Sequence, residues 1–125
     1  KFNRKKMAIN LNGKKAVTHW TLLETFSNLV SLISCKLQTG RTHQIRVHMS
    51  SIGHSLIGDK IYGGLPKKNK TQNNIQKNII TKCKSFSRQA LHSKTLTFEH
   101  PISKKQMHFD IDLPNDIRNL INSIK

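Results

Sequence analysis

The spacing of hydrophobic positions changes along the chain, and its first third favours β-strands. Residues 16–26 are rich in Thr, Val, Trp and Leu, and residues 29–37 form a second apolar run. Ser27-Asn28 lies between the two runs and supplies a turn, which predicts an antiparallel pair of strands. Residues 1–15 are basic and contain the turn signal Asn12-Gly13, so we predict a hairpin or a connecting loop there.

Beyond the second apolar run the spacing becomes helical. Ile45, Met49 and Ile52 share one helical stripe, and Gly53 stands where a helix commonly ends in a left-handed residue. Arg46 is about 100° around the helix from Ile45. We therefore expect Arg46 to lie away from the centre of the packed stripe.

The C-terminal third returns to strands and ends in a helix. Residues 90–98 are predicted to form a strand, and residues 106–113 alternate between apolar and polar side chains. Pro114-Asn115 stops that strand and begins the last helix. The apolar positions expected to face inward are Met107, Phe109, Ile111 and Leu113 in the strand, and Ile117, Leu120, Ile121 and Ile124 in the helix.

Two segments lack a clear period. Residues 55–64 contain three glycines and are predicted to form an ordered loop. Residues 65–87 are rich in Lys, Asn and Gln and contain no acidic residue, which predicts a flexible, solvated insertion. The expected fold class is α+β, with an antiparallel or mixed sheet, a central helix and a C-terminal helix in one domain or part of one.

Charge is the strongest global signal. The chain has 22 Lys and Arg against six Asp and Glu, a net charge of +16 spread over its whole length. Such an excess attracts polyanions, of which nucleic acid is the commonest, although charge does not distinguish RNA from DNA. A membrane-surface protein would need a basic amphipathic helix and a DNA-binding regulator a helix-turn-helix or zinc pattern, and the sequence shows neither. Part of the Lys excess is also consistent with coding bias, because Asn and Ile are abundant as well.

Several other classes of protein are disfavoured. No apolar run approaches the roughly 18 residues of a membrane span and no apolar signal region is present, so the expected location is the cytoplasm. Cys35 and Cys83 are far apart, which predicts neither a disulfide framework nor a zinc knuckle. His43, His48 and His54 are spaced by five and six residues, which does not align them on one helical face. We expect no metal and no cofactor.

The richest chemistry lies in residues 37–48, whose sequence is LQTGRTHQIRVH. An apolar strand end runs into a Thr-Gly turn, and the turn opens onto a helix with two arginines and two histidines. Backbone N–H groups and guanidinium forks at such a junction suit an anion such as a phosphate or a carboxylate. From these residues alone, Arg46 is either an anion-binding group or a solvated arginine on the helix face.

This segment resembles the motif L-x-T-G-R-T-H-Q-I-R-V-H of RluA-type RNA pseudouridine synthases. Residues 58–63 (GDKIYG) resemble the family's G-D-x-x-Y-G loop, and residues 88–93 (RQALHS) resemble R-Q-A-L-H-A with Ser93 in place of alanine. The resemblance covers nearly the whole chain. It implies the central and C-terminal part of a pseudouridine synthase catalytic domain, acting on ribosomal RNA without a cofactor.

The resemblance also implies roles for individual residues. Arg46 would orient the catalytic aspartate, Leu91 would pack against the flipped uracil, and Asp59 would tie its loop to nearby backbone N–H groups. In two cases a simpler role remains open: His43 as a residue that orders the turn, and Leu91 as part of the core. His48 is expected to be packed or hydrogen-bonded within the helix. The residues assigned to RNA or the pocket wall are Arg41, Thr42, His43 and, more weakly, Gln44.

The family's H-R-L-D-x-x-T-S-G segment, which carries the catalytic aspartate, is absent from these residues, as is its Y-x-A-x-V-x-G strand. Both normally precede the position of Lys1, and the chain does not begin with Met. We therefore expect an N-terminal half that is fused, separately encoded or lost, and a chain that is inactive by itself. The alternative is a non-catalytic RNA-binding remnant of the family.

Overall fold

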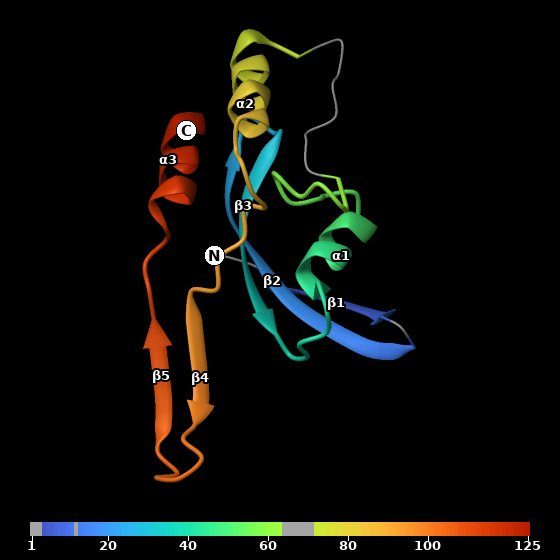
Figure 1. Cartoon of the computed structure of the whole chain (residues 1–125). Coiled ribbons are helices and arrows are strands. Elements are labelled where there is room, and N and C mark those ends of the chain that lie inside the picture. Colours follow the sequence, from blue (N-terminus) through green and yellow to red (C-terminus); the bar gives the residue numbers. More distant parts are fainter. Residues whose placement is uncertain (1–3, 12, 64–71) are drawn as a thin grey trace.

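The computed structural model describes residues 4–11, 13–63 and 72–125, and Figure 1 shows how their helices and strands are arranged. The predicted class, α+β, is confirmed. The elements are β1 (Arg4–Leu11), β2 (Lys14–Phe26), β3 (Val30–Leu37), α1 (Gln44–Ser51), α2 (Asn74–Lys84), β4 (Thr95–Glu99), β5 (Gln106–Asp110) and α3 (Asn115–Ile124).

The strands β1, β2 and β3 form an antiparallel sheet with β2 in the centre. Ser27 and Asn28 connect β2 to β3 with φ angles of 51° and 55°, and the two positive values match the right-handed twist of a tight hairpin. The predicted antiparallel pair is confirmed, and the hairpin expectation for residues 1–15 holds for the described part, because β1 pairs with β2 along its length. Both sheets in the described residues are antiparallel.

Helix α1 follows the sheet and packs against β1 and β2 (Figure 1). It ends where the sequence predicts, since Gly53 has a φ of 81° and its N–H donates to the carbonyl of Ser50 at 3.0 Å. Residues 53–63 then run back along α1 as the predicted ordered loop.

Helix α2 corrects the prediction for residues 65–87. Residues 65–71 lie outside the described residues, but residues 74–84 form a helix with Ile79, Ile80 and Cys83 buried. Asn73 and Gln76 form a reciprocal capping box at its start, and Gln76 Nε2 also donates to the carbonyl of Ser27 at 3.0 Å. The expectation of a solvated segment with few anchors is therefore wrong for α2.

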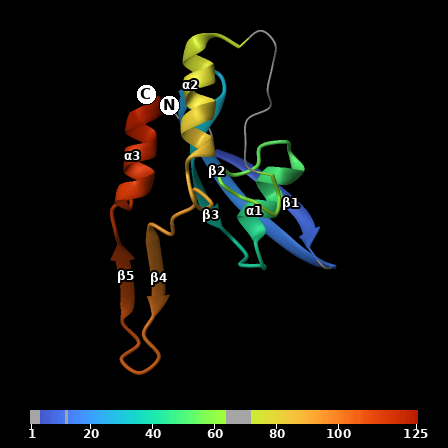
Figure 2. The ribbon, with the colours of Figure 1, turned by 45° about the horizontal axis from the view of Figure 1, so that its top comes forward.

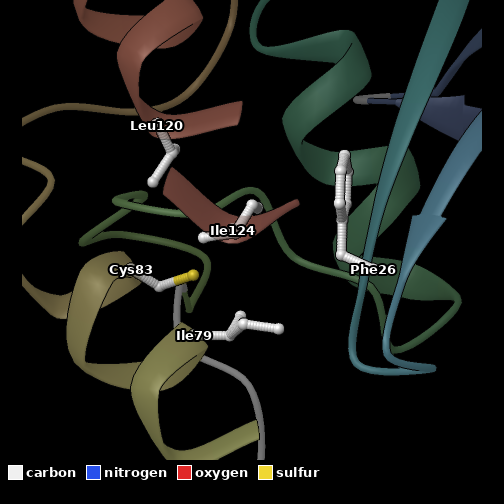
Figure 3. Packing of buried hydrophobic residues seen from close by; sticks show 5 residues of the cluster. All are labelled: Phe26, Ile79, Cys83, Leu120 and Ile124. Carbon is white, nitrogen blue, oxygen red and sulfur yellow. The ribbon is translucent and has the colours of Figure 1, made fainter. Parts of the chain in front are cut away.

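The main hydrophobic core lies where α2, α3 and the turn end of the sheet meet. Figure 3 shows its five most buried members. Helix α3 begins after Pro114 as predicted and turns its apolar stripe toward α2. The buried side chains of the cluster are Phe26, Ile79, Cys83, Leu120 and Ile124.

The strands β4 and β5 form a separate hairpin that extends away from the rest of the chain (Figure 2). The first predicted strand is shorter than expected, because residues 90–94 are not paired. The alternation predicted for residues 106–113 is present, but its apolar side chains do not face a core: Phe109 is 49% exposed and Ile111 58% exposed. Nothing in the described part of the chain covers this face of the hairpin. Among the described residues, no helix is long and apolar enough to cross a membrane.

Candidate functional site

The turn before α1 is fixed by the side chain of Gln44, which is 3% exposed. Its Oε1 accepts hydrogen bonds from the N–H of Arg41 (2.9 Å) and the hydroxyl of Thr39 (2.8 Å). Its Nε2 donates to the carbonyl of Val17 and to the hydroxyl of Thr18, each at 2.9 Å. All four hydrogen-bonding positions of the amide are used, so Gln44 supports the turn and has no polar group left for a substrate. The expected contact of Gln44 with substrate stays a prediction, and the observed bonds give this side chain a structural role.

Helix α1 presents polar side chains to two different neighbours. Gln44 and His48 are four residues apart and face the sheet, whereas Arg46 and Ser50 face the loop 53–63. The predicted packed stripe is only partly right, because Met49 is buried but Ile52 is 45% exposed. Packing on two sides explains why Arg46, expected at the margin, is 9% exposed.

Asp59 of the loop 53–63 holds the guanidinium of Arg46 side-on. Arg46 Nε donates to Asp59 Oδ2 at 2.8 Å and Nη2 donates to Oδ1 at 2.9 Å, which is a bidentate pair. The side chain of Asp59 is fully buried and that of Arg46 is 10% exposed. A buried pair of this geometry keeps both groups charged and in one orientation.

Asp59 also orders its own loop. Its Oδ1 accepts from the N–H groups of Ile61 (3.1 Å) and Tyr62 (3.2 Å), which confirms the structural role predicted for this carboxylate. Chiefly because of the hydrogen bond from Arg46, and further because of these two N–H groups, the pKa of Asp59 is lowered to about 2. The carboxylate is thus ionised over the whole physiological range.

Tyr62 covers the Arg46 guanidinium and reaches the turn. The carbon at the centre of the guanidinium lies 5.1 Å from the centroid of the Tyr62 ring, a cation–π distance. The Tyr62 hydroxyl is 3.2 Å from His43 Nδ1, and the two rings meet edge to face. His43 itself has a φ of 51°, an uncommon conformation for a residue with a side chain and one that is found at functional sites.

One edge of the Arg46 guanidinium remains open. A guanidinium has five N–H groups, and Asp59 uses two of them. Within the part of the chain that the structure describes, Nη1 makes no hydrogen bond, and it is not among the fully buried unpartnered atoms. The Nη1 and Nη2 groups can therefore donate hydrogen bonds to a second anion. The pair with Asp59 fixes the orientation of the guanidinium for this second contact.

His48 connects α1 to β2, and the prediction of a hydrogen-bonded helix histidine is confirmed. Its Nδ1 is 2.7 Å from the Thr18 hydroxyl. That hydroxyl also accepts from Gln44 Nε2, so Thr18 links the imidazole of His48 to the amide of Gln44. Nε2 is buried and has no hydrogen-bond partner among the described residues. Burial also lowers the pKa of His48, so the ring is neutral at pH 7.

The segment around Leu91 packs beside the Asp59 loop. The N–H of Ala90 donates to the carbonyl of Ile57 at 2.8 Å. Gly58 is required here, because a Cβ would stand 1.9 Å from the carbonyl oxygen of Arg88. Arg88 in turn forms a bidentate pair with Asp116 at the start of α3. Three segments distant in sequence, 39–50, 57–63 and 88–91, thus come together.

The structure separates the predicted site residues into two groups. Arg46 lies in the buried cluster, and His43 lies above it through Tyr62. Arg41 and Thr42 are exposed on the turn, and Leu91 is half-buried next to the loop. The role of Tyr62 and the pairing of Arg46 with Asp59 were not predicted; the signal for both was the spacing of Asp59 and Tyr62 in the GDKIYG loop. No group of three or more potential metal ligands occurs among the described residues.

The sequence of the chain is similar to those of known proteins. A sequence model of the family described as RNA pseudouridylate synthase matches residues 2–51, which include the sheet, the turn and α1. The chain is thus similar to this family over residues 2–51.

Its relatives include proteins named ribosomal large subunit pseudouridine synthase D. The chain is 48% identical over 124 residues to that of Zymomonas mobilis, 43% identical over 119 residues to that of Haemophilus influenzae, and 44% identical over 122 residues to that of Yersinia pestis. These alignments cover 98%, 95% and 98% of the chain, respectively. The chain spans 36% of the length of each of these relatives.

Proposed function

We propose that this protein is an RNA pseudouridine synthase that converts uridine to pseudouridine in large-subunit ribosomal RNA, without a metal or a cofactor. The names of the relatives support this activity and substrate. The 125 residues would form the C-terminal portion of the catalytic domain, with the pseudouridine synthase fold completed by the rest of the domain.

The open fork of Arg46 is the observation that carries the proposal. In this reaction the target base is flipped out of the RNA and an aspartate adds covalently to the nucleoside. The glycosidic bond then breaks and the uracil is rejoined to the ribose through carbon. The nucleophilic aspartate must be ionised and aimed. A guanidinium that is already fixed by Asp59 and Tyr62 would hold that second carboxylate at Nη1 and Nη2 without reorganising.

The remaining residues of the site would bind the RNA. Arg41 and Thr42 are exposed on the turn and would contact phosphates, and His43 would form a wall of the base pocket with Tyr62. Leu91 would pack against the flipped uracil, as the resemblance implies. No carboxylate in the described residues other than Asp59 contacts Arg46, so the nucleophile would come from another segment. We therefore propose that the 125-residue chain alone does not convert uridine.

A hybrid enzyme tests the role of Arg46. This chain replaces the matching 36% of the Zymomonas mobilis synthase, and pseudouridine is measured in large-subunit RNA. We expect conversion by the hybrid and a kcat lowered on the order of 100-fold by Arg46→Ala, because one preorganised charged donor is lost. Arg46→Lys should not restore activity, because an ammonium group cannot form bidentate hydrogen bonds with two carboxylates at once.

Arg118→Ala is the matched control. Arg118 is exposed on α3, and the only hydrogen bond of its side chain in the described residues is to the carbonyl of Leu113. We expect its kcat to equal that of the unmodified hybrid. An Arg46→Ala hybrid that is as active as the control would rule out the proposed role. A folded hybrid that binds RNA but makes no pseudouridine would instead favour the non-catalytic RNA-binding remnant.

A further inference from the structure

The three-stranded sheet has two faces of different character. Thr18 and Met7 are paired across β1 and β2, and Thr18 contacts α1, so their face of the sheet is covered by that helix. Successive side chains of a strand point to opposite faces. The other face therefore carries the alternate positions, which we call the polar sheet face. Its polar members are Lys6 and Asn10 of β1, Lys15 and His19 of β2, Lys36 of β3, and Gln38; Ala8 and the buried Val17 lie between them on the same face.

Basic side chains form a row across the polar sheet face. Lys6 is paired with His19, and His19 is paired with Lys36, so the three side chains lie side by side across all three strands. His19 Nε2 is 3.0 Å from Gln38 Oε1. Both lysines are exposed, and two strand spacings separate them by roughly 10 Å, close to one Debye length at physiological salt. A single anionic strand would feel both charges at once.

No acidic residue offsets this charge. Glu24 is the only acidic residue in positions 4–37, and it lies beyond the bulge in β2, near the turn end of the sheet. Two like charges about one Debye length apart repel each other weakly, and an anion lying over the row offsets that repulsion. Lys6, His19 and Lys36 have no exposed large apolar side chain beside them of the kind that anchors a membrane-binding surface; Leu23, which is 41% exposed, lies at the bulge beyond this row.

The polar sheet face continues into the candidate active site. Arg41 Nε donates to the carbonyl of Lys15 at 3.3 Å, which places the Arg41 side chain against the start of β2. The next residues of the turn lead to His43 and, through Tyr62, to Arg46. Positive groups thus extend from the sheet to the entrance of the site.

We infer that the polar sheet face binds the phosphate backbone of the RNA strand that leads to the target uridine. Lys6, Lys36 and Arg41 contact successive phosphates, while His19 and Gln38 lie between them and offer hydrogen bonds to phosphate or ribose. This inference rests on the proposed function. It assigns the RNA backbone a defined path along the protein, whereas the net charge alone predicts only a general attraction. Contacts to phosphates position the strand but do not select its sequence.

The test uses the hybrid synthase and the double substitution Lys6→Gln, Lys36→Gln. RNA affinity is measured at several salt concentrations, and single-turnover conversion is measured at saturating RNA. We expect affinity to fall about tenfold at low salt, and the slope of log affinity against log salt to decrease in magnitude by about 1.4 to 1.8, because two phosphate contacts are lost. The conversion rate at saturation should not change.

The matched control is Lys77→Gln, Lys82→Gln, which removes the same charge from the exposed surface of α2. It should change neither the slope nor the conversion rate. If the Lys6/Lys36 variant and this control have equal affinities and slopes, the inference is wrong. That result is separate from a failure of the proposed function, which would appear as a lack of conversion by the unmodified hybrid. If the polar sheet face binds an acidic protein segment instead of RNA, the Lys6/Lys36 variant and the control will also have equal affinities for RNA, and the inference is wrong.

Discussion

At the residue scale, the candidate site depends on one buried ion pair and the groups that orient it. Arg46 is held by the carboxylate of Asp59 on one edge and by the ring of Tyr62 on one face. A lone arginine with 9% exposure would leave a desolvated charge, so Asp59 stabilises the folded state whatever else the pair does. The chemistry of the site is built on the edge that this pairing leaves open.

Asp59 makes the stability of the folded chain depend on pH in the acidic range. The pKa of Asp59 is about 2 in the folded protein, below its ordinary value of 3.8. A lowered carboxyl pKa contributes stability that is complete above pH 3.8 and is lost as the pH falls toward 2. The shift corresponds to about 2 kcal/mol of the free energy of unfolding. Urea unfolding of the chain at pH 6 and pH 3 should show about half of this loss, about 1 kcal/mol, because pH 3 lies between the two pKa values.

Asp59→Asn provides the comparison. At pH 6 it should be less stable than the unmodified chain by about 3 kcal/mol, because Arg46 keeps its charge without a partner. Between pH 4 and pH 2 the difference between the two proteins should shrink. A difference that stays constant with pH would show that Asp59 does not carry the predicted ion-pair energy.

At the element scale, α1 and α2 are placed by polar contacts that local propensity does not provide. Gln44 and His48 attach α1 to β2 through Thr18. The capping residue Gln76 attaches α2 to the carbonyl of Ser27 in the β2–β3 turn. Met49 is the buried apolar residue of α1, whereas α2 buries Ile79, Ile80 and Cys83, so polar bonds and buried apolar side chains together decide where each helix packs.

Thr18→Val tests the attachment of α1. Valine has a similar shape but no hydroxyl, so Nδ1 of His48 and one N–H of Gln44 lose their partner inside the protein. Leaving buried polar groups unpaired should lower the free energy of unfolding by about 2 kcal/mol. Thr25→Val, at an exposed position of the same strand, is the control and should be nearly neutral. Equal unfolding midpoints in urea would contradict this assignment.

Ile79→Ala and Ile75→Ala test whether α2 is a core element. Ile79 is 2% exposed and Ile75 is 64% exposed on the same helix, so the two substitutions remove the same atoms from different surroundings. We expect Ile79→Ala to cost about 3 kcal/mol and Ile75→Ala to cost less than about 1 kcal/mol. Thermal and urea unfolding measure both. If both substitutions lowered the free energy of unfolding equally, residues 74–84 would be a solvated segment, as the composition predicted.

At the scale of the whole molecule, the β4–β5 hairpin presents an apolar face that the described chain does not cover. Leu96 is paired with Phe109, and Phe98 with Met107; Leu96, Phe98 and Phe109 are 56%, 41% and 49% exposed. The opposite face of the hairpin is polar, with Thr97 opposite His108. Contiguous apolar area of this kind promotes association.

We therefore predict that the 125-residue chain self-associates, and that the hairpin causes it. Leu96→Thr with Phe109→Thr should shift the chain toward monomer in sedimentation experiments over a range of concentrations. Leu23→Thr with Ile75→Thr removes two exposed apolar side chains elsewhere and should leave association unchanged. A chain that stays monomeric at all concentrations, or equal effects of the two pairs, would argue against a role for the hairpin face.

The amino-acid sequence by itself determined the local elements and the chemistry available to them. Alternation and turn residues gave the β2–β3 pair, Gly53 gave the end of α1, and Pro114 gave the start of α3. These features depend on neighbours a few residues apart, which is why they can be predicted. The capping box of Asn73 and Gln76 carried the same kind of signal for α2, but the polar composition around it concealed the helix.

Only the tertiary structure decided which polar groups are used up and which remain open. Gln44 and Arg46 are two residues apart on the same helix, yet one is fully bonded to the sheet and the other keeps a free edge. The difference comes from Val17 and Thr18, which lie 27 and 26 positions from Gln44 in the sequence, and from Asp59, which lies 13 positions from Arg46. All three form hydrogen bonds with these partners. Burial and pairing depend on all the neighbours of a group together, and these are set by packing rather than by local pattern.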